Sequence, residues 1–87
     1  MRLDKYLQVS RLVKRRTLAK EMCVRGQVTV NGGVAKAARD VAVGDVIALD
    51  FGWRVLEVEV TALPAGVGTK GRELYRIVRV ERKDPGL

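Results

Sequence analysis

Residues 11–32, which read RLVKRRTLAKEMCVRGQVTVNG, constrain the fold more than any other stretch of this chain. A short helical pattern ends at Gly26, the residue type that most readily adopts the left-handed conformation found just after a helix. The alternating residues 27–30 then lead into Asn31–Gly32, a pair typical of a strand that enters a tight hairpin turn. The stretch therefore predicts a helix, a strand and the start of a returning strand.

Two helices are predicted in the N-terminal part of the chain. Residues 1–14 have apolar or small residues at spacings of three and four, as expected for one buried helical face. A second helix is predicted to end at about Arg25, with Arg16 or Thr17 near its N-cap. The residues expected to be buried are Leu3, Tyr6, Leu7, Ser10 and Val13 on the first helix, and Leu18, Ala19, Met22 and Cys23 on the second.

The remainder of the chain predicts strands and turns. Alternating patterns over residues 46–49, 54–61 and 74–80 indicate three strands, and residues 63–71 are expected to form a loop. Residues 81–87 are polar and are expected to fray. We expect one domain over residues 1–87, with a motif core at about 2–49, a strand extension at about 54–82 and a flexible tail at 83–87.

Positive charge is concentrated in the first half of the chain. The formal net charge is +7, yet residues 1–39 hold ten lysines and arginines against two acids, whereas residues 40–87 hold seven against eight. A charge that served only solubility would be mixed along the chain, so this segregation favours a polyanionic partner such as nucleic acid. With four scattered aromatic residues, structured RNA recognised by shape and backbone fits better than bases stacked on a sheet.

Several classes of function are poorly supported. The chain has no histidine, so the commonest general base and metal ligand are absent, and it has one cysteine, Cys23, which we assign to the core. We therefore expect no catalytic residue, no metal and no cofactor. No apolar run approaches the length of a membrane span, and a cytoplasmic location without membrane contact is expected. A small RNA-modifying enzyme and a DNA-binding protein remain alternatives.

The start of the second helix is the strongest candidate site. A helix N-terminus presents unpaired backbone N–H groups and a partial positive charge, which suit phosphate. Arg15 and Arg16 lie at this end, Thr17 follows and Lys20 is one turn further on. Because arginines here oppose the helix dipole, a function in phosphate binding explains them better than stability does.

Other polar residues extend this prediction. Asp4 has three interpretations: it suits the positive end of the first helix, it holds Arg2 or Arg16 in a fixed position, or it faces an amine on a partner. Lys36 and Arg39 lie in an irregular stretch and would extend the basic surface.

The motifs RLDKYL and KRRTLAKE, followed by G-x-V-x-VNG, resemble the alpha-L RNA-binding motif typified by small-subunit ribosomal protein S-four. The resemblance covers about residues 2–49 and rests on Arg16, Ala19, Gly26 and residues 28–32 at the family's spacing. It implies an α+β fold in which two N-terminal helices pack on a small, twisted, mostly antiparallel sheet. It also implies that the helical face and its flanking turn bind RNA.

Among free-standing members of that group, the chain is most similar to the RqcP family, the RQC P-site tRNA stabilising factors. Its start at residues 1–5, the run SRLVKRRTLAKE and its length carry this resemblance. It implies a non-catalytic protein that acts as a monomer when free, binds ribosomal RNA of the large subunit and P-site tRNA, and works with an RqcH-type (NEMF-family) factor during template-free alanine tailing. A heat-shock-type factor that rescues large subunits is the alternative. The implied RNA-binding residues are Arg2, Asp4 and Arg16, supported by Lys5, Arg11, Lys14, Arg15 and Lys20.

Overall fold

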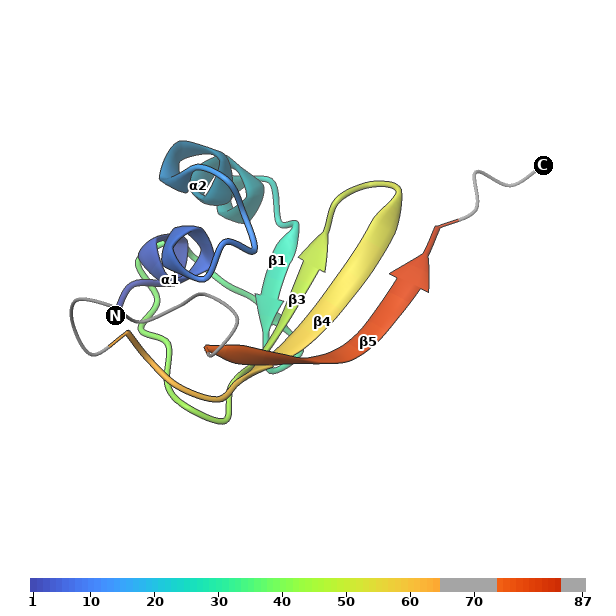
Figure 1. Cartoon of the computed structure of the whole chain (residues 1–87). Coiled ribbons are helices and arrows are strands. Elements are labelled where there is room, and N and C mark those ends of the chain that lie inside the picture. Colours follow the sequence, from blue (N-terminus) through green and yellow to red (C-terminus); the bar gives the residue numbers. More distant parts are fainter. Residues whose placement is uncertain (65–73, 84–87) are drawn as a thin grey trace.

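The computed structural model describes residues 1–64 and 74–83, which form two short helices against a five-stranded antiparallel sheet (Figure 1). The sheet order is β2-β1-β3-β4-β5, and both helices lie on one side of it. The predicted α+β fold is therefore confirmed. The helices are α1 (Leu3–Val9) and α2 (Arg16–Val24), and the strands are β1 (Val28–Val30), β2 (Gly33–Val34), β3 (Val46–Asp50), β4 (Arg54–Val60) and β5 (Tyr75–Arg82).

Helix α1 is shorter than the sequence predicts. It ends at Val9, and Arg11 has a positive φ of 64°, a left-handed conformation that stops the helix. The Val13 backbone N–H then donates to the Leu7 carbonyl at 3.1 Å, which folds the chain back over the helix end. The prediction that the helix continues to Lys14 is wrong. Ser10 and Val13 are buried as expected, but this turn buries them, and not a longer helix.

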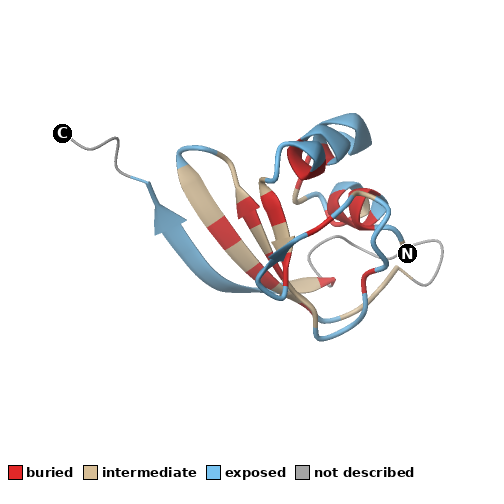
Figure 2. Ribbon diagram, turned by 180° about the vertical axis from the view of Figure 1, so that it is seen from behind, coloured by how far each residue is buried: buried red, intermediate tan, exposed pale blue. Residues whose placement is uncertain are grey.

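The core lies between the helices and the facing side of the sheet (Figure 2). All five residues predicted for the buried face of the first helical segment are buried, and so are Ala19, Met22 and Cys23 of α2. Leu18 was predicted to join them, but 44% of it is exposed. Because Leu18 and Ala19 differ by 100° around a helix, only a narrow stripe of α2 reaches the core. Within the described residues, no helix is long and apolar enough to cross a membrane.

The predicted hairpin between β1 and β2 is confirmed. Asn31 and Gly32 have φ values of 53° and 87°, the left-handed pair required by a two-residue turn. The Asn31 side chain also ties this turn to the next strand: its Oδ1 accepts from the Val46 backbone N–H at 2.9 Å, and its Nδ2 donates to Asp45.

Strand β5 forms one edge of the sheet and runs further than the sequence predicts. Glu81 and Arg82 were expected to fray, but they pair with Val55 and Arg54 of β4. The register of the β4–β5 pair shifts at a bulge between Glu57 and Val58. Most of the predicted loop, residues 65–71, and the end of the tail, residues 84–87, lie outside the described part of the chain.

Candidate nucleic-acid interface

The start of α1 is held in place by the loop that precedes β3. The Leu3 backbone N–H donates to the Arg39 carbonyl at 2.8 Å, and the Asp4 backbone N–H donates to the Ala37 carbonyl at 3.1 Å. Two N–H groups that a helix start normally leaves unpaired are thus satisfied within the protein. This contact places Lys36 and Arg39, which are both exposed, beside the N-terminus of the chain.

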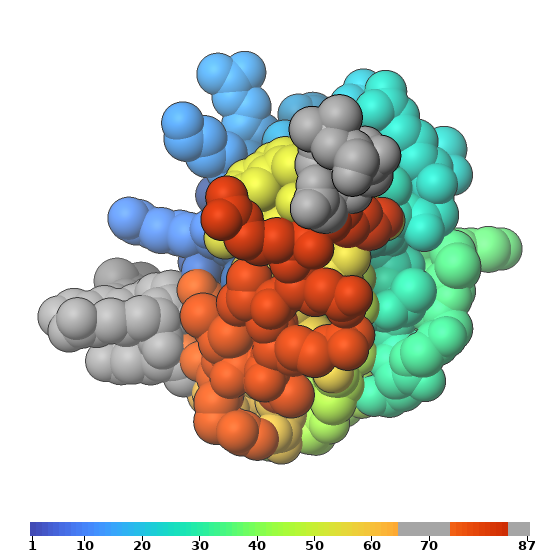
Figure 3. All heavy atoms as spheres, turned by 90° about the vertical axis from the view of Figure 1, so that its right-hand side faces the viewer, coloured from blue at the N-terminus to red at the C-terminus, as the bar shows by residue number. Residues whose placement is uncertain are grey.

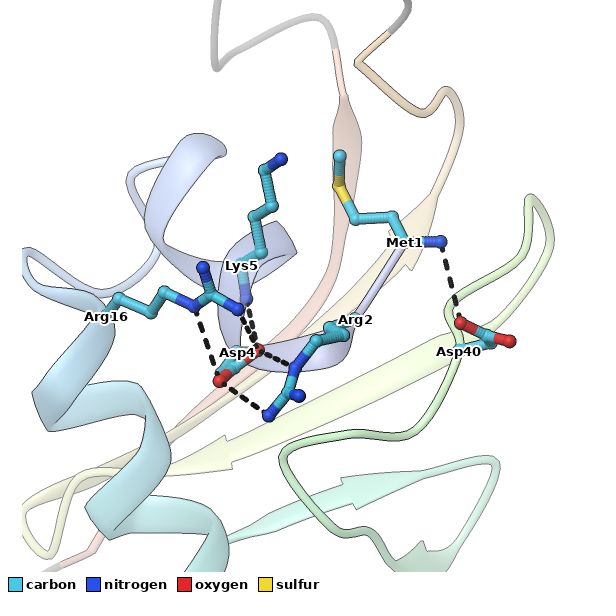
Figure 4. Close-up of polar contacts among 6 residues, drawn as sticks. All are labelled: Met1, Arg2, Asp4, Lys5, Arg16 and Asp40. Atoms are coloured by element: carbon cyan, nitrogen blue, oxygen red, sulfur yellow. Dashed lines mark hydrogen bonds and ion pairs between the residues drawn. The ribbon is translucent and has the colours of Figure 1, made fainter.

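A buried carboxylate joins the two helices. Asp4, with 3% of its side chain exposed, binds two arginines (Figure 4). Arg2 donates through Nε to Oδ1 at 3.2 Å and through Nη2 to Oδ2 at 3.3 Å. Arg16, from the first turn of α2, places Nη2 at 3.5 Å from Oδ1 and Nε at 3.4 Å from Oδ2. The interpretation that Asp4 holds an arginine is therefore confirmed, and it applies to both arginines.

The charge state of this cluster follows from its contacts. Burial raises the pKa of the Asp4 carboxyl, but hydrogen bonds from Arg2, Arg16 and the Lys5 backbone N–H outweigh burial and hold that pKa below its usual value. Asp4 is therefore ionised at neutral pH, and the three side chains together carry one net positive charge. The Arg2 and Arg16 side chains remain 46% and 48% exposed. Each guanidinium uses Nε and one Nη on Asp4, which leaves the other donors free for a ligand.

The N-terminus of α2 is open. The N-cap residue is Arg15, and not Arg16 or Thr17 as predicted; it has an extended conformation and makes no side-chain capping bond. In the part of the chain that the structure describes, the backbone N–H groups of Arg16, Thr17 and Leu18 have no hydrogen-bond partner. This contrasts with α1, whose first N–H groups are occupied by the loop. The end of α2 can therefore accept a phosphate group through its backbone, with arginine donors beside it.

Further cations without an acidic partner are found in the helical half of the chain. The described residues form seven ion pairs, and in the first half of the chain these engage only the N-terminal amine, Arg2 and Arg16. Among the described residues of the first half, the exposed cations without an acidic partner are Lys5, Arg11, Lys14, Arg15, Lys20, Arg25, Lys36 and Arg39. By contrast, Arg76, Arg79 and Lys83 of the second half are each paired with an acid. The unpaired charge is thus concentrated on the helical half.

The predicted site residues fall into three groups. Arg2, Asp4 and Arg16 form the bonded cluster, and Lys5 lies next to it (Figure 4). Arg11, Lys14 and Arg15 lie on the connection between the helices, whereas Thr17 and Lys20 lie exposed on α2. Lys36 lies exposed in the loop whose backbone contacts the start of α1. Arg39, predicted with Lys36 to extend the basic surface, lies in the same loop, and its carbonyl accepts from the Leu3 backbone N–H.

The comparisons with known proteins agree with this architecture. Residues 1–47 match the S4 domain. The chain is 47% identical over 85 residues to the RQC P-site tRNA stabilizing factor of Halalkalibacterium halodurans, an alignment that covers 98% of this chain and 94% of that protein. It is 42% identical over 85 residues to the factor of the same name from Listeria monocytogenes, covering 97% and 92%. The chain belongs to this family. The resemblance inferred from the sequence motifs is thereby confirmed.

A solved structure extends the likeness to the fold. The trimeric structure of Vibrio cholerae Heat Shock Protein 15 matches with a TM-score of 0.81 and 31% sequence identity, over 90% of this chain and 81% of that one. The part of this chain that matches the S4 domain, residues 1–47, contains both helices and the Arg2–Asp4–Arg16 cluster. Strands β4 and β5 lie after it.

Proposed function

We propose that this protein is a non-catalytic, ribosome-associated RNA-binding factor of cytoplasmic quality control that stabilises P-site peptidyl-tRNA on the large ribosomal subunit. The observation that carries the proposal is the Arg2–Asp4–Arg16 cluster, in which a buried carboxylate fixes two half-exposed guanidinium groups beside an open helix N-terminus. Such arginines are prepositioned for bidentate contacts with phosphate oxygens and lose little conformational freedom on binding. The choice of P-site tRNA as the bound RNA is based on the names of the relatives.

The same site supports a division of roles among residues. Arg2 and Arg16 would contact the RNA backbone directly, and Asp4 would act as a positioning residue because its oxygens are already occupied. The surrounding cations would add phosphate contacts of a less specific kind, since lysines act as flexible point charges. These are Lys5, Arg11, Lys14, Arg15, Lys20 and Lys36, with Thr17 as a hydroxyl donor. The family resemblance further suggests monomeric action beside an RqcH-type factor during alanine tailing.

A second candidate function is that of a heat-shock-type factor that rescues large subunits carrying nascent chains. The observation that favours it is the match to Heat Shock Protein 15 over most of both chains. Both functions would use the same basic face. They would differ in which state of the large ribosomal subunit the protein binds, and not in the residues that bind it.

Sedimentation of the tagged protein from a lysate, with sequencing of the copurified RNA, tests the proposal. We expect the protein on free large subunits that contain tRNA, and we expect Arg16→Glu to lose that fraction. Arg16→Lys, which keeps the charge but not the fork of donors, should retain an intermediate amount. Arg25→Glu is the matched control, because it reverses a charge at the other end of α2. Equal sedimentation of the Arg16 and Arg25 variants, both folded by circular dichroism, would contradict the assigned site.

A further inference from the structure

The end of the sheet formed by the β3–β4 turn and the last residues of β5 carries a second cluster of aromatic and basic residues. The Trp53 carbonyl accepts from the Lys83 backbone N–H at 3.0 Å, and Arg54 stands opposite Arg82 in the β4–β5 register. Figure 3 shows the yellow β3–β4 turn and the red end of β5 adjoining at the top of the molecule. Residues far apart in sequence thus meet at this end, outside the helical site.

The two arginines form an unfavourable pair. Arg54 and Arg82 lie directly opposite each other on the face of the sheet that also carries Leu56 and Val80. Like charges in directly opposite positions destabilise a sheet. Within the described residues neither arginine has an acidic partner, whereas the neighbouring cations Arg79 and Lys83 do. The Nε atom of Arg54 is buried and has no hydrogen-bond partner there. An anion between the two guanidinium groups would relieve this repulsion.

An exposed aromatic ring stands beside the arginine pair. The Arg54 guanidinium lies 4.6 Å from the centre of the Trp53 ring and 5.4 Å from that of Phe51. This stacking orders one face of the indole, yet 59% of Trp53 remains exposed. A cation stacked on an exposed ring contributes modestly to stability, whereas an ordered indole with one open face is a platform on which any nucleobase can stack.

We propose that Trp53, Arg54 and Arg82 form a second RNA contact that takes an unpaired nucleotide. The base would stack on the indole face away from Arg54, and a phosphate of the same strand would lie between the two guanidinium groups. This contact rests on the proposed function, because it assumes that the partner is RNA, but it uses none of the residues of the helical site. The protein would then bind an unpaired stretch of the RNA at this second contact, in addition to the phosphate backbone that it binds at the helical site.

Trp53 is the chain's one tryptophan, so its fluorescence reports directly on stacking. We expect single-stranded oligoadenylate to quench it saturably, and we expect inorganic polyphosphate and duplex RNA to leave it nearly unchanged. Trp53→Ala should weaken oligoadenylate binding, measured by anisotropy of a labelled strand, by roughly 5-fold to 150-fold. Trp53→Phe should lose less, because it keeps a smaller stacking surface.

The substitution Arg82→Gln distinguishes a role of Arg82 in RNA binding from a role in stabilising the fold. Removing one of two opposed charges should leave the urea midpoint unchanged or raise it, while it weakens oligoadenylate binding and quenching. Arg79→Gln, on the other face of the same strand, is the matched control and should bind as the wild type does. Oligoadenylate binding that leaves the Trp53 fluorescence unchanged, or equal quenching of that fluorescence by polyphosphate, would overturn the second contact. Neither result would contradict the helical site. Failure to bind ribosomal RNA at all would instead contradict the proposed function.

Discussion

At the scale of single residues, Asp4 links stability to function, and its contribution must depend on pH. Its pKa in the folded protein lies below the ordinary value of 3.8. The stabilisation is therefore fully present above the pKa of the unfolded chain and is lost as the pH falls through the lower, folded value. An ionised Asp4 also keeps both guanidinium groups in place, so the same acidification would release them.

Asp4→Asn tests this linkage. We expect the variant to be less stable at pH 7 by about 1 to 3 kcal/mol, a modest value for a buried carboxylate because both guanidinium groups remain half exposed to water. Urea unfolding at pH 7 and at pH 3 would measure the difference from wild type at each pH. The difference should shrink at the lower pH; a difference that stayed constant would mean that the charge of Asp4 does not matter.

Tyr6 makes a second residue-scale link, from α1 to the start of β5. Its hydroxyl donates to the Leu74 carbonyl at 2.6 Å, and burial, with a smaller effect of Tyr75, raises the pKa of Tyr6 to about 12. Tyr6→Phe should cost about 0.5 to 1.5 kcal/mol, because the Leu74 carbonyl still accepts from Thr61 and Ala62 backbone N–H groups. Since the folded pKa exceeds the ordinary 10.0, the tyrosine stabilises below pH 10 and loses this effect as the pH rises towards 12. Urea unfolding of both proteins across that range should show the gap closing.

At the scale of elements, helix α2 ends where the backbone adopts a left-handed conformation at Gly26. Gly26 has a φ of 75°, and a Cβ atom built there would meet no atom within 4 Å. Gly26→Ala should therefore destabilise by about 1 kcal/mol through strain without any clash, and Gly26→Asn should cost less. Gly33→Ala, where the backbone is not left-handed and the new Cβ makes an ordinary contact, is the control. Equal urea midpoints for the Gly26→Ala protein and the control would contradict this account of the cap.

The same elements show what the sequence could and could not predict. The Gly26 stop and the Asn31–Gly32 turn follow from local backbone preferences, so their positions were predicted correctly. The end of α1 was missed because Val13 is buried at helical spacing but reaches the core through the turn at Arg11. Clusters made by tertiary contact have no signal in local spacing. That Asp4 holds Arg2 or Arg16 was one of several open interpretations. The opposite positions of Arg54 and Arg82 could be found only from the β4–β5 register.

At the scale of the whole molecule, free positive charge and paired charge are separated. On the outer face of β4 and β5, Glu57 and Glu59 pair with Arg79 and Arg76. Among the described side-chain cations around α1 and α2, only Arg2 and Arg16 are paired with an acid, which is Asp4. Cations that neutralise RNA phosphates release condensed counterions, and most of the described cations available for such contacts lie in the helical half. The salt dependence of affinity should therefore depend on the helical half of the protein.

This separation predicts how the affinity for large-subunit RNA changes with salt. The logarithm of affinity should fall with the logarithm of salt concentration at roughly 0.7 to 0.9 per phosphate contact. Lys5→Gln and Lys20→Gln should each lower that slope by about the value of one contact. Arg79→Gln should leave the slope unchanged, because this arginine is already paired with Glu57 and Glu81. Filter binding at several salt concentrations measures the slopes. Equal reductions by all three substitutions would mean that net charge, and not a defined face, attracts the RNA.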